Sequence, residues 1–506
     1  MQTRALSEQP PPGANDATAP TPLTVVAQLD LARETPPRRI SALGRMAEQE
    51  WAPALLFFIC DVVCWVGIYR SLSFLRHDAY FSSGFEFAVI EILQLAVIVQ
   101  CLFIIGGYTA RTEMRGLTYT AEHILAMLAA LAISALLIYT AATFDQSMKP
   151  SRSAVLASFI AFTPISLLYR RALRRRVAEA SANRAFLVIG AGELALTFYQ
   201  AYRSSANPQC LEFIDLQQKK VGEPIAGPGS PLIEGDLASK LSEAHKRYSG
   251  IILAEGVDRI RPDLLDRLIR AQFQRTRVYT LESFYEAHWR YVPMHSIDPY
   301  WPLQTGFQLS RTLPYHYLKR LFDVASSVLG LIILSPLMAM IAGLIWVTNG
   351  RPVIFTQQRV GRDDGLFTLY KFRTMKNGGS EEGDLYTRED DPRISRLGWC
   401  LRKARVDELP QLWNVFKGDM SLIGPRAEWV ECVRRYEEKI PLYHFRHLVK
   451  PGITGWAQVN YPYGESERDA VEKLKYDLYY IRHYSLKLDA MIALKTVHTM
   501  LFSKGR

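Results

Sequence analysis

The sequence predicts a multi-domain membrane protein with a four-helix transmembrane bundle, a Rossmann-like α/β domain and an α+β domain that carries a re-entrant membrane helix. Three observations predict this fold class. Apolar residues are concentrated in long segments, a strand–glycine–helix pattern follows them, and the last third is dense in charged residues, glycine and proline. At 506 residues the chain is too long for one domain, so we divide it into residues 1–50, 51–176, 177–310 and 311–506.

The first 50 residues are predicted to form a disordered cytoplasmic tail. Residues 1–40 are rich in proline, alanine and threonine and contain no continuous apolar core. A signal peptide needs such a core, and a chain that buries little apolar surface does not fold on its own.

Four apolar segments follow the tail, at residues 52–75, 85–107, 117–144 and 150–169. Each has about 20 residues or more, enough to cross a bilayer at a rise of roughly 1.5 Å per residue. Basic residues gather before the first segment and after the second and fourth, so the positive-inside rule places the N-terminus and the chain after residue 176 in the cytoplasm. These residues are Arg38, Arg39, Arg45, Arg111, Arg115, Arg170, Arg171, Arg174, Arg175 and Arg176.

Two acidic residues, Asp61 and Glu91, lie inside these apolar segments. Ionisable residues in a membrane span are costly and often functional. The alternative, which we favour, is that they serve interhelical packing or mark the ends of their spans.

Residues 185–300 are predicted to form a soluble α/β unit with strands at 185–189, 249–254 and 277–280. The first strand leads into Gly190 and Gly192 of a G-x-G-x-x-A pattern, and Asp215 follows about 20 residues later, as in a dinucleotide-binding fingerprint. Such glycines let backbone N–H groups approach a pyrophosphate. The alternative is a Rossmann-like scaffold that binds no cofactor.

A further apolar segment, Val324–Val347, carries Ser335-Pro336 at its middle. Proline removes a backbone donor and kinks or breaks a helix. Because basic residues flank both ends, we predict a re-entrant helix at about 324–348 that breaks at Ser335-Pro336 and returns to the cytoplasmic face. A kinked spanning helix is the alternative.

The adjacent acids Asp407 and Glu408 are the strongest candidates for chemistry. The run from Glu408 to Lys417 is helical in period, which predicts Asp407 at the N-cap, where a helix lowers the pKa of a carboxylate. Glu408 could hold a divalent cation such as Mg²⁺ on a pyrophosphate. Arg402 and Arg405 lie just upstream and could neutralise phosphate charge. Taken alone, Asp407 is better explained as a structural cap, and the neighbouring acid and cations favour a functional role.

The net charge and the cysteine content limit the classes of partner and the compartment. The formal charge of +10 suits a protein that contacts anionic lipid and phosphorylated substrates, and the sequence contains no nucleic-acid-binding module. The six cysteines show no metal-ligand spacing and suit a reduced compartment.

From Tyr317 to about Lys504 the sequence resembles the bacterial sugar transferase family, the monotopic phosphoglycosyl transferases. The four spans and the α/β unit resemble its large subclass, the undecaprenyl-phosphate glucose or galactose phosphotransferase type, which initiates exopolysaccharide, capsule or O-antigen assembly. The motifs that carry the resemblance are Lys319–Asp323, Ser335-Pro336, Tyr370–Met375, Val406–Asn414, Lys417–Arg426, Lys450–Asn460 and Tyr476–Tyr480.

The resemblance implies an activity for the last domain. It would transfer a hexose-1-phosphate from a UDP-hexose to undecaprenyl phosphate, release UMP and pass through a covalent aspartyl-phosphosugar. It also implies the bacterial cytoplasmic (inner) membrane, a multi-pass chain with its catalytic domain on the cytoplasmic face, contact with membrane lipid, and a homodimer.

The resemblance also implies residue roles. Asp407 would be the nucleophile and Glu408 would assist Mg²⁺. The other residues expected at the site are the charge partners Arg402 and Lys371, the neighbouring carboxylate Asp477, and the substrate contacts Pro425, Arg426, Arg359 and Arg373, of which Lys371 and Arg373 share one face of the strand 369–375.

Two departures limit this transfer. The family commonly has Pro-Arg-Pro where this chain has Ala427 after Pro425-Arg426, and small members have Asn-Gly-Arg where this chain has Asn460-Tyr461. One basic phosphate contact is therefore absent at that position.

Two other functions compete. A membrane-bound nucleotide-sugar dehydratase would use a Tyr-x-x-x-Lys pair, a spacing that Tyr315 and Lys319 have. A scaffold for polysaccharide assembly would have no activity. Release of UMP, as opposed to reduction of NAD or no reaction, separates the three.

Overall fold

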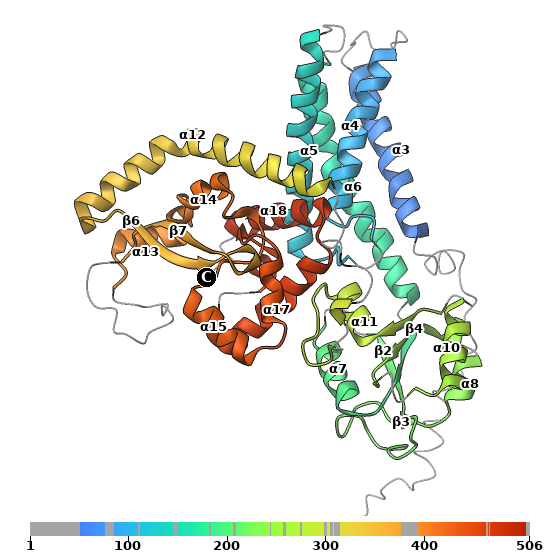
Figure 1. The fold of residues 1–506 in the computed structure, drawn as a ribbon. Helices are drawn as coiled ribbons and strands as arrows, with labels where there is room; N and C mark the ends of the chain where they lie inside the picture. Colours follow the sequence, from blue (N-terminus) through green and yellow to red (C-terminus); the bar gives the residue numbers. More distant parts are fainter. Residues whose placement is uncertain are drawn as a thin grey trace, which may run out of the picture.

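The computed structural model describes residues 51–501 except 76–84, 110–111, 145–149, 182–183, 206–208, 243, 257–259, 274–275, 298–300, 304–306, 308–313, 376–392, 462–463 and 465. The tail predicted at residues 1–50 lies outside the described residues. Three units are visible in Figure 1: a tall helical bundle, an α/β unit below it, and a C-terminal α+β unit beside both.

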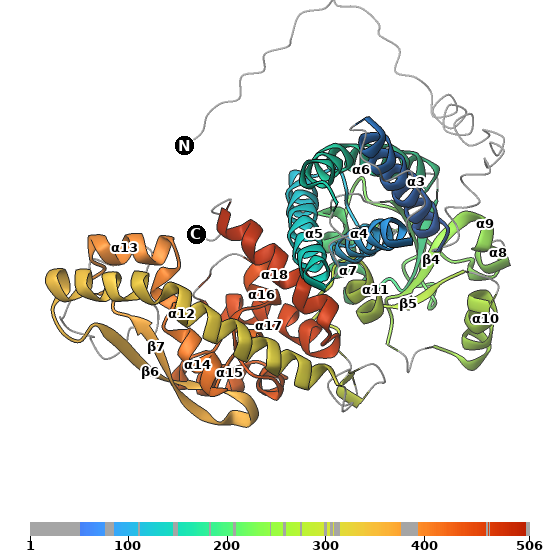
Figure 2. The same cartoon turned by 90° about the horizontal axis from the view of Figure 1, so that it is seen from above.

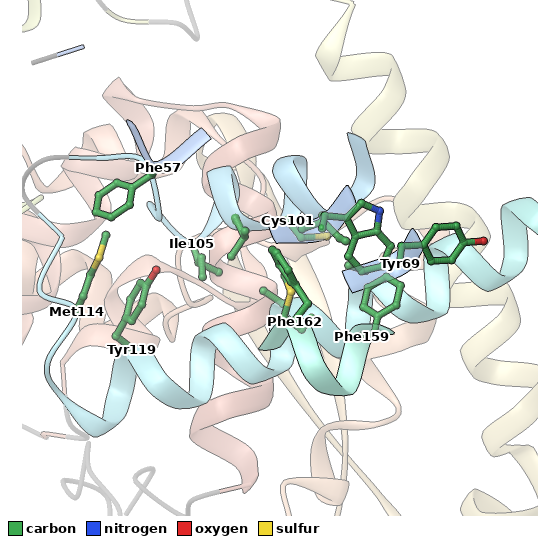
Figure 3. Close-up of a cluster of buried hydrophobic side chains, with 14 of the residues drawn as sticks. Phe57, Tyr69, Cys101, Ile105, Met114, Tyr119, Phe159 and Phe162 are labelled. Carbon is green, nitrogen blue, oxygen red and sulfur yellow. The ribbon is translucent and has the colours of Figure 1, made fainter. Parts of the chain in front are cut away.

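The bundle consists of the four predicted helices, which lie side by side when viewed along their axes (Figure 2). α3, α5 and residues 152–176 of α6 are long and apolar enough to cross a membrane, whereas the apolar part of α4 is shorter, at 88–104. Aromatic side chains fill the core, among them Tyr69, Phe159 and Phe162 (Figure 3). The Trp65 ring packs edge-on to both phenylalanines. The helices are α3 (Trp51–Leu75), α4 (Phe85–Ile104), α5 (Leu117–Phe144) and α6 (Arg152–Ser181).

Both intramembrane acids pair with arginine. The Asp61 carboxylate accepts hydrogen bonds from Tyr108, Tyr169 and Arg170, and its ion pair with Arg170 measures 2.5 Å with both side chains fully buried. Arg70 Nη2 lies 3.0 Å from the Glu91 carboxylate. These contacts join α3 to α6 and α3 to α4, as expected for interhelical packing.

The second unit is a parallel sheet in the order β3-β2-β1-β4-β5, flanked by helices. The three predicted strands are β1, β4 and β5, and the structure adds β2 and β3 on one side of β1. This strand order is that of doubly wound nucleotide-binding folds. The elements are β1 (Ala185–Ile189), α7 (Glu193–Arg203), β2 (Cys210–Ile214), β3 (Ile233–Glu234), α8 (Leu237–Ser242), α9 (Ala244–Arg247), β4 (Tyr248–Leu253), α10 (Pro262–Phe273), β5 (Val278–Thr280) and α11 (Leu281–His288).

The long apolar helix α12 (Tyr315–Asn349) opens the C-terminal unit. The break predicted at Ser335-Pro336 is wrong, because the helix continues through Pro336 over all 35 residues. The Ser335 hydroxyl donates to the Ile332 carbonyl, 2.8 Å away, inside the turn that the proline disturbs. Figure 1 shows α12 as an arch whose two ends bend toward the rest of its unit, and both views show it beside the bundle, directed away from the bundle helices and not along them. Proline is thus accommodated by curvature.

The remainder of the C-terminal unit mixes short strands and helices, as predicted for an α+β domain. β6 and β7 pair antiparallel, and β8 and β9 pair parallel. The elements are η4 (Trp301–Leu303), β6 (Ile354–Val360), η6 (Arg362–Asp364), β7 (Leu366–Phe372), α13 (Arg396–Lys403), η7 (Val406–Glu408), α14 (Gln411–Lys417), β8 (Ser421–Ile423), α15 (Val430–Lys439), η8 (Tyr443–Leu448), β9 (Gly452–Thr454), α16 (Trp456–Asn460), α17 (Glu467–Arg482) and α18 (Leu486–Leu501).

The C-terminal unit docks on the other two units. α18 packs on the bundle, with the Lys487 ammonium 3.7 Å from the centre of the Phe103 ring and Lys495 Nζ 3.7 Å from the Glu122 carboxylate. On the α/β side, Arg482 Nη1 of α17 lies 3.2 Å from the carboxylate of buried Glu286 of α11. The three units therefore form one connected body.

Candidate active site

The adjacent acids Asp407 and Glu408 lie in the 3₁₀ turn η7, between α13 and α14. The prediction that Asp407 caps the following helix is wrong. α14 begins at Gln411 with Pro410 at its N-cap, and no side chain caps it. The chain reaches the turn through Arg405, whose φ of 55° places it in the left-handed region. From this turn the Glu408 carboxylate reaches Lys371 of β7.

Glu408 is held by two cations. Its Oε1 atom lies 3.0 Å from Lys371 Nζ of β7 and 3.2 Å from Arg426 Nη2. Burial raises the pKa of Glu408, but Lys371 and Arg426 outweigh burial and hold that pKa well below its usual range. Glu408 is therefore ionised throughout the physiological range.

The pKa of Asp407 is shifted in the opposite direction from that of Glu408. It is 9% exposed and makes no hydrogen bond with any residue in the described part of the chain. Burial and the adjacent Glu408 charge raise the pKa of Asp407, against the opposing influence of Lys371, Arg402 and Arg426. The expected lowering by a helix N-terminus is absent because no helix begins at Asp407.

The structure places Arg402 and Lys371 beside the carboxylate pair. Arg402, on α13, donates from Nε to the Thr374 hydroxyl at 2.9 Å, and its charge acts on Asp407. Burial lowers the pKa of Lys371, while the Glu408 charge opposes that shift. Both cations thus border the carboxylate pair.

The segment after β8 supplies Pro425 and Arg426. The Pro425 carbonyl accepts a hydrogen bond from Gly452 N at 2.8 Å, which fixes this segment to β9 while Arg426 extends to Glu408. Arg359 of β6 contacts the residue that follows them, since its Nη1 donates to the Ala427 carbonyl at 3.1 Å. Burial lowers the pKa of Arg359, and the neighbouring Arg426 lowers it further against the pull of Glu428.

Arg373 is not brought to the carboxylate pair by any hydrogen bond or ion pair that the structure describes. Its guanidinium donates to the carbonyls of Met375 at 2.9 Å and Arg351 at 3.0 Å. β7 spans Leu366–Phe372 and not the predicted 369–375, although Arg373 N still donates to the Val353 carbonyl of the neighbouring chain segment at 2.9 Å. The shared strand face of Lys371 and Arg373 stays a prediction.

Asp477 is 1% exposed and reaches the site through Arg446, which the sequence analysis missed. Arg446 Nη2 lies 3.0 Å from Asp477 Oδ2 and 3.1 Å from the Arg426 carbonyl. Burial raises the pKa of Asp477 to about 6, despite the opposing Arg446 charge. Asp477 Oδ1 has no hydrogen-bond partner among the residues that the structure describes.

Two more charged residues were missed, Glu428 and Lys473. Burial raises the pKa of Glu428, but Arg446 and Arg359 outweigh it and lower that pKa. Lys473 donates to the Gly464 carbonyl at 2.7 Å, and its charge acts on both Glu428 and Asp477. No spacing rule links these positions, which lie on separate segments; only their position between recognised motifs could have indicated them.

The site combines a carboxylate that lacks a hydrogen bond with a group of cations around its neighbour. Such an arrangement can bind a diphosphate and attack phosphorus. The residues also suit a divalent cation such as Mg²⁺, which prefers carboxylate oxygens. Asp407 offers its carboxylate, but Lys371 and Arg426 already occupy Oε1 of Glu408. Glu408 would therefore contribute its other oxygen.

The glycine turn of the α/β unit has a structural explanation. Gly190 has a φ of +130°, and a Cβ there would lie 2.6 Å from the Ala254 carbonyl oxygen, so glycine is required for the approach of β1 to β4. Around Gly192 the structure describes nothing within 4 Å of an added Cβ.

Asp215, the expected ribose contact, is engaged locally. Its carboxylate accepts hydrogen bonds from the backbone N–H groups of Gln217, Lys219 and Lys220, each at 2.9 Å. Cofactor binding at Gly190 and Gly192 stays a prediction, and the engagement of Asp215 favours the scaffold alternative.

Tyr315 and Lys319, the pair that suggested a dehydratase, are not placed for that chemistry. The Tyr315 hydroxyl and the Lys319 ammonium both donate to the Asp489 carboxylate of α18. Lys319 also donates to the Ile423 carbonyl at 3.0 Å. These contacts connect α12 to the rest of the C-terminal unit. They involve no residue of the glycine turn, which belongs to the α/β unit.

Comparison with known proteins gives a match in the region that holds the site. The family model described as "Bacterial sugar transferase" matches residues 314–503. The chain is 43% identical over 201 residues to the UDP-N-acetylgalactosamine-undecaprenyl-phosphate N-acetylgalactosaminephosphotransferase of Aeromonas hydrophila, covering 39% of this chain and 48% of that one. It is 40% identical over 193 residues to the undecaprenyl-phosphate glucose phosphotransferase of Komagataeibacter xylinus, covering 37% and 36%.

A shorter relative is matched almost throughout. The chain is 40% identical over 186 residues to the exopolysaccharide production protein PSS of Rhizobium leguminosarum bv. phaseoli, covering 36% of this chain and 93% of that one. The matches thus span less than half the length of the two larger relatives and nearly all of the small one.

Proposed function

Because this chain belongs to the bacterial sugar transferase family, we propose that it transfers a hexose-1-phosphate from a UDP-hexose to undecaprenyl phosphate and releases UMP. The observation that carries the proposal is the Asp407–Glu408 pair with Lys371 and Arg426 around it, inside the matched residues. The product would initiate exopolysaccharide, capsule or O-antigen synthesis.

The reaction has two displacements at one phosphorus. An Asp407 carboxylate oxygen attacks the β-phosphorus of the UDP-hexose, the bond to the bridging oxygen breaks, and UMP leaves with the electron pair. An oxygen of undecaprenyl phosphate then attacks the same phosphorus and restores the Asp407 carboxylate. The two products are UMP and a diphosphate-linked sugar, so atoms and charge balance.

The surrounding cations stabilise charge on phosphorus. Lys371, Arg402 and Arg426 lie around the carboxylate pair and favour the ionised form of Asp407. Arg426 is the expected contact for the donor phosphates, with Pro425 fixing its backbone. Lys473 is our candidate for the basic contact that the family's Asn-Gly-Arg motif would supply, because its charge acts on the same network.

A bound Mg²⁺ would supply charge neutralisation on the diphosphate. Asp407 and Glu408 would hold it, with Glu408 using the oxygen opposite Lys371. Removal of divalent cations by a chelator is therefore expected to stop UMP release and to be reversed by added Mg²⁺.

The fold suggests how the site meets the lipid acceptor. We propose that the arch of α12 lies in the cytoplasmic leaflet of the inner membrane with both ends on the cytoplasmic side, so that the site faces the bilayer surface. We propose that the α/β unit is a Rossmann-like scaffold that binds no nucleotide. Assembly as a homodimer is a further proposal.

The test uses purified full-length protein with Mg²⁺, undecaprenyl phosphate and a panel of UDP-sugars. The proposal expects UMP release with one or more donors and none without the lipid acceptor beyond a single turnover. Release of UDP, or reduction of NAD without UMP, would exclude this function. The donor that gives the fastest release identifies the sugar.

A further inference from the structure

We propose that Arg320 and Lys450 form a binding site for the phosphate headgroup of an anionic phospholipid, at the C-terminal end of α14. The proposal depends on the placement of α12 in the membrane but not on the transfer reaction.

The two cations converge over Gly418, the residue that ends α14. A Cβ added at Gly418 would lie 3.2 Å from Arg320 Nη2 and 3.5 Å from Lys450 Nζ. Gly418 has a φ of +98°, a conformation that favours glycine. Because glycine has no side chain, none projects from this position toward the two cations. The two positive groups therefore share one small region of surface.

The Arg320 guanidinium and the backbone next to Lys450 are held by hydrogen bonds. Arg320 of α12 donates from Nη1 to the Val415 carbonyl at 2.7 Å and from Nη2 to the Phe416 carbonyl at 2.8 Å. Lys450 precedes Pro451, whose carbonyl accepts a hydrogen bond from Ser421 N at 2.9 Å. The site is thus built on fixed elements rather than on mobile side chains alone.

Helix capping explains Arg320 but not Lys450. The partly buried Lys450 ammonium makes no hydrogen bond or ion pair with any residue that the structure describes, so it caps no carbonyl of α14. Burial lowers the pKa of Lys450, and Arg320 and Arg362 lower it further, because the three cations repel one another. An anion placed among them would relieve this repulsion.

The nearby acids are already engaged. Asp323 accepts a hydrogen bond from Leu422 N at 3.0 Å, and Asp419 accepts from Lys417 at 3.1 Å. Their charges act on Lys450 and oppose the lowering of its pKa, but neither forms an ion pair with it among the described residues. An external anion can therefore still pair with the Lys450 ammonium.

The surroundings identify the anion as part of a lipid. Trp413 and Phe416 on α14 are 48% and 39% exposed and lie 5.4 Å apart between ring centres, and Leu448 beside Lys450 is 39% exposed. Tyr317, near Arg320 on α12, is 79% exposed. Aromatic and basic residues together are typical of the headgroup region of a membrane. There the lipid acyl chains contact the aromatic side chains, and the lipid phosphates contact the cations.

The separation from the carboxylate pair excludes the reacting acceptor as the occupant. Asp407 lies before α14 and Gly418 follows it, and the seven residues of α14 alone extend about 10 Å. A phosphate at Gly418 cannot attack phosphorus at Asp407. We therefore assign the site to a bulk anionic phospholipid such as phosphatidylglycerol, which would fix the depth of this unit at the bilayer.

The test is native mass spectrometry of the detergent-solubilised full chain titrated with phosphatidylglycerol. Lys450→Gln is expected to weaken retention of one phosphatidylglycerol at least tenfold, with UMP release in detergent unchanged. Lys450→Arg keeps the charge and is expected to retain the lipid, which separates charge loss from misfolding. Lys439→Gln, on exposed α15, is the matched control and is expected to bind as the wild type does.

Parallel titrations with phosphatidylcholine, undecaprenyl phosphate and inorganic phosphate identify the ligand. Equal retention of phosphatidylglycerol by Lys450→Gln and wild type overturns the proposal, as does equal binding of phosphatidylcholine. Loss of undecaprenyl phosphate alone would assign the site to the acceptor, and binding of inorganic phosphate with the affinity of the lipid would exclude a lipid site. Loss of UMP release in wild type would instead contradict the proposed function.

Discussion

Asp477 shows how burial and pairing oppose each other at one residue. Its carboxylate is 1% exposed, one oxygen pairs with Arg446, and the other has no partner within the described ranges. Through Arg446, which also donates to the Arg426 carbonyl, Asp477 positions a residue that contacts Glu408. We therefore interpret Asp477 as a positioning residue rather than the catalytic one that the sequence suggested.

The titration of Asp477 predicts a specific pH dependence of stability. Burial raises the pKa of Asp477 to about 6, whereas an unfolded aspartate titrates near pH 4. The folded state then binds the proton more tightly, so this contribution to stability is present below about pH 4 and is lost as the pH rises toward 6, by roughly 3 kcal/mol. Asp477→Asn, which resembles the protonated acid, is expected to lack this loss in thermal unfolding followed from pH 4 to 7.

Asp215→Asn is the matched control for that measurement. Burial raises the pKa of Asp215, but three backbone N–H groups outweigh it and lower the pKa, so its contribution is lost as the pH falls. The difference in stability between variant and wild type should therefore change with pH in opposite directions for the two variants. Parallel slopes would show that Asp477 does not hold its proton in the folded protein.

At the scale of elements, the path of α12 would determine which side of the membrane the proposed site occupies. The apolar surface of α12 is largely exposed, and few residues of its most apolar stretch are buried. A helix that crossed the membrane would place the C-terminus outside the cytoplasm, whereas an arch would return the chain to the cytoplasmic side. The two topologies therefore place Arg506 on opposite sides of the membrane.

We expect a single cysteine introduced at Arg506, in a variant without the native cysteines, to react with a membrane-impermeant maleimide only after the inner membrane is opened. Labelling in intact spheroplasts would contradict the arch and the cytoplasmic site together. A cysteine at Phe144, the end of α5 away from the cytoplasm in the predicted topology, is the control that should label from outside.

Element by element, the sequence predicted what apolar periodicity and motif spacing determine. The four bundle helices, β1 with its glycine turn, and the α+β character of the last unit are confirmed. Three expectations failed for local reasons: α12 bends without breaking at Pro336, α14 begins after Pro410 and not at Asp407, and β7 ends before Arg373. Each failure concerns where an element ends, which single-residue backbone geometry determines and periodicity does not.

Contacts between distant segments were the least predictable part of the site. Arg446 and Glu428 have no motif that links them to Asp477 or Arg359, since charge pairing across a fold depends on topology. Lys371 and Glu408 were each named from the sequence, but their 3.0 Å ion pair follows only from the approach of η7 to β7.

For the whole molecule, the pair of Asp61 and Arg170 joins the bundle on which α18 of the C-terminal unit docks. Removing one partner leaves an uncompensated buried charge, which costs about 3–5 kcal/mol. We expect Arg170→Met to lower the thermal unfolding temperature in detergent and to reduce UMP release through loss of docking.

The double variant Asp61→Leu with Arg170→Met removes both charges and should recover most of that loss. Arg152→Met, an exposed position at the other end of α6, is the matched control and should behave as wild type. If the double variant is no more stable than Arg170→Met alone, the pair is not the source of the effect.

In the proposed mechanism, Asp407 becomes covalently bonded to the sugar phosphate. The most direct test incubates the protein with its UDP-sugar and Mg²⁺ in the absence of lipid acceptor, quenches with acid, and maps the mass of the peptide that carries Asp407. We predict a hexose-phosphate adduct on Asp407, one equivalent of UMP, loss of the adduct on adding undecaprenyl phosphate, and no adduct in Asp407→Asn, while Asp419→Asn still forms one. Turnover with no adduct, or full UMP release by Asp407→Asn, would contradict the account.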